Sequence, residues 1–167
     1  LEMNNIMKIE ENSNSINIRD PYTITDKADG ERKLLFISKK GKMYLIDTNL
    51  SIQFTGCIST KNFNTLIDGE HVLYDKHGKY INKYFAFDLY YYHKEDWRIY
   101  PFIFIDDMKY KIKMDINKFR LKKLTEIING LDVKSITGKS LPMIISIKKF
   151  YSSKGDEVFK NAKIICS

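Results

Sequence analysis

Residues 80–92 read Tyr-Ile-Asn-Lys-Tyr-Phe-Ala-Phe-Asp-Leu-Tyr-Tyr-Tyr, an aromatic run that is typical of a long β-strand. The run follows Asp75-Lys76-His77-Gly78, a turn sequence that predicts a hairpin with a strand at Val72–Tyr74. Alternation along this strand would place Phe85 and Phe87 on one face, and Ala86 and Asp88 on the other. This hairpin predicts antiparallel pairing at the centre of the fold.

The remaining segments predict short strands and a few helices. Strands are expected at residues 21–26, 33–38, 43–46, 51–54, 63–67 and 141–150. Apolar spacing predicts helices at residues 1–11, 115–129 and 157–166. The predicted fold class is therefore α+β, with mostly antiparallel sheets and packed helices, in a single domain over residues 1–167.

Composition excludes several classes of protein. Hydrophobic residues make up 43% of the 167 residues and charged residues 29%, which excludes disorder along the whole chain. No apolar run has the length of a membrane helix, so we expect no membrane partner. Cys57 and Cys166 are too few for a disulfide framework, which favours a reducing compartment. A formal charge of +7 suits nucleotides or nucleic acid, but a solvated lysine surface would produce the same charge.

Residues 25–32, Thr-Asp-Lys-Ala-Asp-Gly-Glu-Arg, place an amine, a carboxylate and a guanidinium around one turn. Lys27 follows a predicted strand, Asp29 and Gly30 come next, and Arg32 closes the motif. An unprotonated lysine amine can attack a phosphate, and burial or a neighbouring positive charge promotes the unprotonated form. A charged β-turn without chemistry explains the same four residues.

Two further segments add carboxylates and aromatic rings. Asp68-Gly69-Glu70 sets a carboxylate on each side of a glycine, a pattern that can hold a divalent metal or a ribose hydroxyl. A bulged strand with outward polar residues is the alternative. The aromatic run around Phe87 can stack on a base, although aromatic side chains in strands more often belong to the core.

The order of these motifs resembles the covalent nucleotidyltransferases, namely mRNA capping guanylyltransferases and ATP-dependent polynucleotide ligases. Residues 27–32 resemble their first motif, residues 68–70 the third, and residues 84–88 the aromatic motif that follows it. The version at residues 25–32 is most similar to capping enzymes of large cytoplasmic DNA viruses. Residues 145–150 also resemble the lysine-bearing strand that occurs later in the domain.

The resemblance implies a role for each matching residue. Lys27 would attack the α-phosphate of GTP, forming lysyl-GMP, which then passes to the 5′-diphosphate end of mRNA. Asp29, Gly30 and Arg32 would contact the nucleotide, with Arg32 at the ribose. Glu70 would bind the ribose or the metal ion, Mg²⁺ or Mn²⁺.

The base-binding residues implied by the resemblance lie later in the chain. Phe87 would stack on guanine. Lys148, chosen over Lys149, would lie near the base or the phosphate. We expect Lys27 and Glu70 to share one concave pocket, because a single site must collect all the motifs.

The family pattern continues beyond residue 167 with an acidic motif, a Lys-x-Lys motif and an OB-fold domain, so residues 1–167 alone are expected to be inactive. The implied setting is the cytoplasm, in a viral factory or virion, with a methyltransferase domain or subunit as a further partner. Two alternatives remain: a polynucleotide ligase that uses ATP, and a non-catalytic RNA-binding module of the same fold. Ligases usually carry a glutamate where this chain has Thr25.

Overall fold

A computed structural model describes residues 3–7, 17–104 and 115–166. These residues form two compact units. The first unit contains the described residues up to Lys27 and those from Lys149 onward. The second unit contains Ala28–Phe104 and residues 115–148. The single domain predicted over residues 1–167 remains a prediction.

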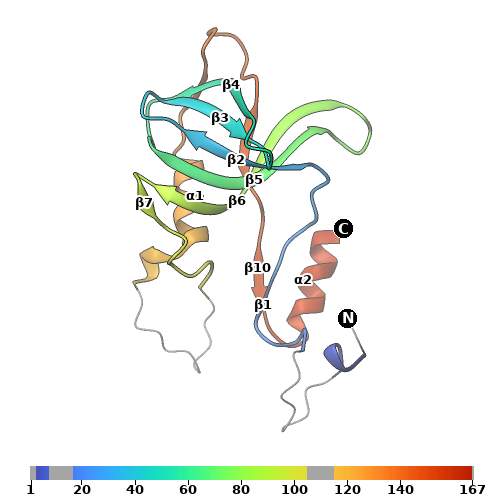
Figure 1. Cartoon of the computed structure of the whole chain (residues 1–167). Coiled ribbons are helices and arrows are strands. Elements are labelled where there is room, and N and C mark those ends of the chain that lie inside the picture. Colours follow the sequence, from blue (N-terminus) through green and yellow to red (C-terminus); the bar gives the residue numbers. More distant parts are fainter. Residues whose placement is uncertain (1–2, 8–16, 105–114, 167) are drawn as a thin grey trace. The chain divides into compact units, whose positions relative to one another are not determined.

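The second unit is built on an eight-stranded sheet (Figure 1). Its strands are β2 (Glu31–Ile37), β3 (Lys42–Ile46), β4 (Ile52–Ser59), β5 (Thr65–Tyr74), β6 (Tyr80–Tyr92), β7 (Glu95–Asp96), β8 (Val133–Ser135) and β9 (Ile144–Ile147). The order along the main path is β7-β6-β5-β2-β3-β4-β8, and β9 pairs with β6. All of these pairs are antiparallel except β6–β9, which confirms the predicted α+β class with mostly antiparallel sheet.

One helix packs against this sheet and completes its core. The helix α1 (Arg120–Asn129) follows the 3₁₀ helix η3 (Ile116–Lys118) and ends before Gly130, as its sequence predicts. Leu124 and Ile127 of α1 are buried in the same cluster as Leu89 of the sheet. Apolar residues at helical spacing therefore place α1 on the buried face of the sheet.

Tyr84 lies at the centre of the buried face and explains one glycine of the predicted motifs. Its side chain is fully buried, and its hydroxyl donates to the backbone carbonyls of Lys33 at 2.8 Å and Ile67 at 3.1 Å. A Cβ on Gly69 would lie 2.4 Å from the Tyr84 ring. Any larger residue than glycine in Asp68-Gly69-Glu70 would collide with this ring.

The first unit contains a two-stranded sheet and a helix. Its elements are η1 (Met3–Asn5), β1 (Tyr22–Ile24), β10 (Tyr151–Ser153) and α2 (Glu157–Cys166). β1 and β10 pair in antiparallel register. Arg19 forms an ion pair with Asp156 and lies over the Phe159 ring, 4.9 Å from its centroid. These contacts join segments from opposite ends of the chain.

Several predicted boundaries differ from the structure. The two strands expected at residues 63–67 and 72–74 form the single strand β5, and the strand expected at 141–150 is reduced to β9. Of the helix expected at residues 1–11, the described part is the short η1. The strands β7, β8 and β10 have two or three residues, too few for a periodic pattern to be visible in the sequence.

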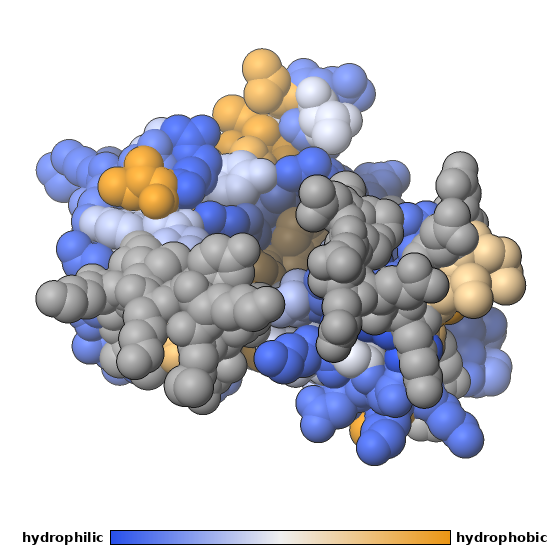
Figure 2. Space-filling model, turned by 90° about the horizontal axis from the view of Figure 1, so that it is seen from below, coloured by the Kyte–Doolittle hydropathy of each residue, from blue (hydrophilic) through white to orange (hydrophobic). Residues whose placement is uncertain are grey.

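The face of the described residues that Figure 2 shows is largely hydrophilic. Figure 2 shows mostly blue residues among the coloured atoms, interrupted by separate hydrophobic patches. Among the helices of the described residues, none combines the length and the hydropathy that crossing a membrane requires.

Candidate functional site

Two of the predicted motifs lie on neighbouring strands of the second unit. β2 and β5 pair antiparallel, with Arg32 opposite Glu70 and Lys33 opposite Gly69. Residues that face each other in such a pair have their side chains on the same side of the sheet. The arginine of the first motif and the glutamate of the third therefore share one face.

Gly30 brings the loop before β2 into contact with Glu70. Its backbone N–H donates to Oε1 of Glu70 at 3.2 Å. A Cβ on Gly30 would lie 2.6 Å from the backbone oxygen of His71 and 2.9 Å from Cγ of Glu70. Only glycine permits this close approach, which gives the glycine of the first motif a physical reason.

Arg32 is held by a carboxylate and a hydroxyl. Its Nη2 lies 2.6 Å from Oδ2 of Asp68, and its Nε lies 3.1 Å from Oδ1. Tyr90 donates its hydroxyl to Oδ2 of Asp68 at 2.8 Å and accepts from Nη2 of Arg32 at 2.9 Å. The Asp68 side chain is 2% exposed and that of Arg32 is 57% exposed, so a buried anion orients a cation that still reaches solvent.

The carboxylate of Asp68 raises the pKa of both of its partners, Arg32 and Tyr90. Hydrogen bonding and attraction to Asp68 raise the pKa of Arg32 above its ordinary value. Burial, followed by the hydrogen bond to Asp68, raises the pKa of Tyr90. At neutral pH the Tyr90 hydroxyl therefore keeps its proton and remains a donor to Asp68.

Phe87 lies at a β-bulge that the sequence did not predict. Ala86 pairs with Gly69 and Asp88 pairs with Asp68, so Phe87 is an extra residue on β6. A bulge of this kind disrupts the alternation of side chains. The buried residues of β6 are Tyr84 and Ala86 before Phe87 and Leu89 after it, so the buried face changes from even to odd positions at Phe87.

The bulge corrects the predicted arrangement of this strand. Phe85 pairs with Glu70, and Asp88 pairs with Asp68, whose side chain lies on the Glu70 side of β5. Phe85 and Asp88 therefore share a face, and the expectation that Asp88 shares a face with Ala86 is wrong. Strict alternation fails here because the two strands contribute unequal numbers of residues.

Lys148 lies beside Phe87 in the second unit. Its backbone N–H donates to the carbonyl of Ala86 at 2.8 Å, and its Nζ lies 5.9 Å from the centroid of the Phe87 ring. Lys149 falls in the first unit, where its carbonyl accepts a hydrogen bond from Thr25 at 2.7 Å. Of the two lysines, the structure thus places Lys148 with an aromatic residue of the predicted site.

The other predicted residues lie in the connection between the two units. Lys27 is the last residue of the first unit, and Ala28 begins the second. Lys27 and Asp29 are both exposed. A common pocket for Lys27 and Glu70 stays a prediction.

Sequence reasoning missed two partners that stabilise the site. Tyr90 belongs to the aromatic run of β6, and its hydrogen bond to Asp68 depends on the register of β5 and β6. Arg120 of α1 binds Asp88 through Nε at 2.8 Å and Nη2 at 3.1 Å. Asp88, a carboxylate within an aromatic strand, was the available signal, but it does not reveal an arginine on a distant helix.

The described residues contain no group of three or more His, Cys, Asp or Glu side chains arranged for a metal ion. Asp68 is occupied by Arg32, which leaves Glu70 as the carboxylate of its motif with one oxygen bound to Gly30. Mg²⁺ commonly binds one or two protein carboxylates and completes its coordination with substrate phosphates and water. Glu70 fits a site in which one carboxylate binds the metal together with substrate phosphates and water, better than it fits a site built only from protein ligands.

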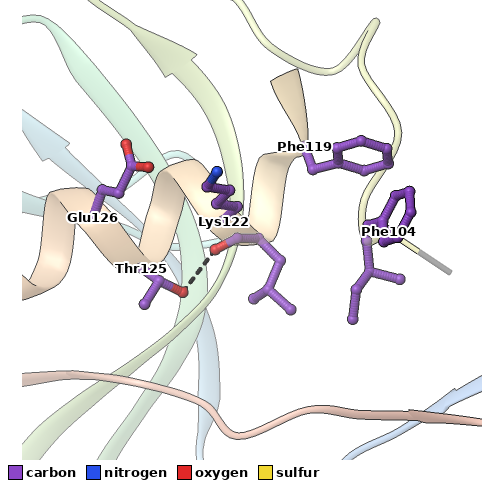
Figure 3. A pocket seen from close by; sticks show the side chains of 7 residues that line it. Phe104, Phe119, Lys122, Thr125 and Glu126 are labelled. Carbon is purple, nitrogen blue, oxygen red and sulfur yellow. Dashed lines mark hydrogen bonds between the residues drawn. The ribbon is translucent and has the colours of Figure 1, made fainter. Parts of the chain in front are cut away.

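A separate cavity of about 550 Å³ lies along α1 (Figure 3). Phe104 and Phe119 stand at one end, and Thr125 donates to the backbone carbonyl of Leu121 at 2.7 Å. None of the predicted site residues lines it. The cavity is therefore distinct from the candidate site on the sheet.

Comparison with known proteins shows which proteins this chain is similar to. No family model matches the chain. A "Probable mRNA-capping enzyme" of Acanthamoeba polyphaga mimivirus is 27% identical, in an alignment that covers 98% of this chain and 13% of that protein. The chain thus spans a small part of the curated relative that it matches.

A solved structure described as mycobacterial DNA ligase D complexed with ATP and MES aligns with a TM-score of 0.49 and 14% identity. This alignment covers 86% of this chain and 44% of the ligase chain. The sequence alignment with the viral protein extends further and includes all the motifs from Lys27 to Lys148, since it spans nearly the whole chain. The predicted resemblance is confirmed: the chain is similar, over almost its entire length, to one segment of a viral protein named as a probable mRNA-capping enzyme.

Proposed function

We propose that this chain is part of an mRNA guanylyltransferase, which transfers GMP from GTP to the 5′-diphosphate end of RNA. The observation that carries the proposal is the pairing of β2 with β5, which brings Arg32 and Glu70 to one face of the sheet. Gly30 and Arg32 follow Lys27 in the sequence by three and five residues. Similarity to a protein named as a capping enzyme supports it.

In the proposed first step, the unprotonated amine of Lys27 attacks the α-phosphorus of GTP. A nitrogen–phosphorus bond forms, the bond to the bridging oxygen breaks, and pyrophosphate leaves with the bonding electron pair. In the second step, a terminal oxygen of the RNA diphosphate displaces Lys27 and forms the 5′–5′ triphosphate linkage. In both steps the oxygens of the transferred phosphoryl group carry negative charge, and cationic groups held in fixed positions must neutralise it.

The residues of the second unit would bind and orient the nucleotide. Arg32, held by Asp68 and Tyr90, would present its exposed guanidinium to the ribose. Phe87 would stack on guanine, and Lys148 beside it would contact the base or a phosphate. Glu70 would hold the ribose or, with the phosphates of GTP, a Mg²⁺ or Mn²⁺ ion, which supplies charge neutralisation when bound.

Lys27→Arg in the complete protein tests the nucleophile. Arginine keeps the positive charge but stays protonated, so it has no lone pair available for attack. We expect the wild type to form a covalent adduct with labelled GTP and a divalent metal, and Lys27→Arg to form none. The adduct should be labile in acid and stable in alkali.

Each other result has a distinct meaning. An adduct on Lys27→Arg would place the nucleophile elsewhere. An adduct formed by the wild type with ATP and none with GTP would favour a polynucleotide ligase. No adduct with either nucleotide, together with salt-sensitive RNA binding, would favour a non-catalytic RNA-binding module.

A further inference from the structure

The hairpin of β5 and β6 extends beyond the rest of its sheet. The last residue of β5 that pairs with β2 is His71, and the first residue of β6 that pairs with β9 is Lys83. Beyond these positions the two strands pair only with each other, through Tyr74 and Tyr80. Residues 72–82 therefore form a two-stranded projection, visible in green in Figure 1, which is called the β5–β6 ribbon below.

The base of the ribbon is fixed by polar contacts. Asn82 has a φ of 41°, a left-handed conformation at the point where the ladder of β5 and β6 shifts register. Its side chain lies 2.7 Å from Nε2 of the buried His71 and donates to the carbonyl of Pro142. The ribbon thus leaves the sheet from an anchored position.

The ribbon presents an exposed aromatic pair. Tyr74 and Tyr80 face each other across the strands, with ring centroids 5.6 Å apart and planes at 67°. They are 57% and 59% exposed, more than any other tyrosine, phenylalanine or tryptophan of the described residues. A cross-strand pair stabilises a hairpin, but that role does not require so much of both rings to face solvent.

The charge of the ribbon is positive. Lys76 and Lys79 are exposed at its turn. The carboxylate of Asp75 accepts backbone hydrogen bonds from His77 at 2.9 Å and Lys79 at 3.0 Å, so it serves the turn itself. The lysine ammonium groups therefore remain available to a polyanion.

The aromatic pair lies on the same face as the candidate site. Along β5, Glu70, Val72 and Tyr74 are separated by two residues each, and the extra residue at the register shift between Val72 and Tyr74 lies on β6, so alternation along β5 places their side chains on one side. At about 3.3 Å per residue, Tyr74 lies roughly 13 Å from Glu70 along the strand. A chain leaving the candidate site along this face would meet Tyr74 and Tyr80.

We propose that the β5–β6 ribbon binds single-stranded RNA and guides the acceptor 5′ end toward the candidate site, an inference that rests on the proposed function. Exposed aromatic rings with nearby lysines are the features that bind single strands without sequence preference, through stacking and phosphate contact. Protein interfaces are depleted in lysine, and the aromatic pair here lies between lysine-bearing segments. RNA therefore fits this surface better than a protein partner.

The experiment separates the two half-reactions in the complete protein. Tyr74→Leu/Tyr80→Leu should form the GTP adduct at the wild-type rate, while its affinity for a 5′-diphosphate single-stranded RNA and its rate of GMP transfer to that RNA should each fall about tenfold. Tyr74→Phe/Tyr80→Phe retains both rings and should bind RNA like the wild type. This second variant distinguishes stacking from any effect of the hydroxyl groups.

A lysine variant tests the same surface without altering the strands. Lys76→Ala/Lys79→Ala should weaken RNA binding and reduce its dependence on salt concentration. The matched control is Lys39→Ala/Lys40→Ala, which removes two exposed lysines from the turn between β2 and β3 and should change RNA binding little. Should the leucine variant fold poorly, this comparison still tests the ribbon.

Wild-type RNA affinity in both the leucine and the lysine variants would overturn the proposal. An equal loss in the Lys39→Ala/Lys40→Ala control would also overturn it, because it would show a diffuse charge effect. If the wild type forms no adduct with GTP, the proposed function fails, yet RNA binding by these variants still decides whether the ribbon is the RNA contact.

Discussion

The position of Arg32 depends on residues that do not need to touch a substrate. Asp68 is almost fully buried and binds two nitrogens of the guanidinium, while Tyr90 binds both partners. Bidentate contacts of this type restrict both the distance and the plane of an arginine. The exposed part of the guanidinium is therefore presented in a single orientation.

Tyr90→Phe should affect nucleotide binding more than the chemical step. Removing the hydroxyl leaves the pair of Arg32 and Asp68 in place but loosens it, at a cost of about 1 kcal/mol. We expect the apparent KM for GTP in adduct formation to rise about fivefold with kcat nearly unchanged. Tyr91→Phe, whose hydroxyl contacts Arg98, is the control.

Initial rates of adduct formation over a range of GTP concentrations give KM and kcat and so test this prediction. A fall in kcat at constant KM would show that Tyr90 contributes to the reacting geometry instead. An equal effect in Tyr91→Phe would show that loss of any hydroxyl on this strand is sufficient.

At the level of single residues, the glycines and charged residues of the site could be predicted from the sequence, but the residues that they contact could not. Gly30 and Gly69 belong to motifs visible in the sequence, and both prove to be required by close contacts. The pairing of Arg32 with Asp68 was not predicted, because it depends on which residues of β2 and β5 face each other. Register across a sheet is a property of two strands and cannot be read from either one alone.

At the level of secondary-structure elements, Asp132 in the connection from α1 to β8 forms hydrogen bonds with residues at the end of β4. Asp132 accepts hydrogen bonds from Oγ of Ser59 at 2.8 Å, from the backbone N–H of Thr60 at 3.1 Å and from the Thr60 hydroxyl. These bonds, led by the one from the Thr60 hydroxyl, lower the pKa of Asp132 to about 2. The carboxylate thus supports the pairing of β4 with β8 at its end.

This lowered pKa predicts how the stability of the second unit depends on pH. The pKa of an unfolded aspartate is about 3.9. A depressed folded-state pKa gives a contribution to stability that is complete above the unfolded value and is lost as the pH falls through about 2. Asp132→Asn should therefore be less stable than the wild type at pH 6, and the difference should shrink below pH 4 and become small by pH 2.

Urea unfolding midpoints of both proteins at pH 6, 4, 3 and 2 test this expectation. A difference that stays constant down to pH 2 would show that the charge of Asp132 is not the source of the stabilisation.

The long elements could be predicted from the sequence, whereas the irregularities within them could not. The bounds of β6 and α2 agree with the predicted residues 80–92 and 157–166. The bulge at Phe87 was missed because the aromatic residues on both sides of it fit a strand whether or not one of them is extra. Alternation predicts a face only while both strands advance together.

At the scale of the whole molecule, the main hydrophobic core lies entirely in the second unit. Every residue of its buried cluster falls between Leu35 and Met143. Trp97, the single tryptophan of the chain, belongs to this cluster and is 6% exposed. It contacts Tyr100 edge to face, with ring centroids 5.1 Å apart, and so reports on the folding of this unit.

Residues 28–148 expressed alone should therefore fold. We expect tryptophan emission characteristic of a buried indole and a cooperative thermal transition within a few degrees of the transition of residues 1–167. Fluorescence during thermal unfolding measures both quantities. Emission from a solvent-exposed tryptophan in the shorter fragment would show that its core needs the first unit.

The pairing of β1 with β10 has a consequence for the order in which the protein is made. Tyr22 leaves the ribosome before its partner Ser153, which is added only after the whole second unit has been synthesised. At about 5–20 residues per second, this interval is on the order of ten seconds. The strands from β2 to β6 can pair during that time, while β1 has to wait, so the segment that carries Lys27 obtains its partner strand only after the strands of the eight-stranded sheet have been made.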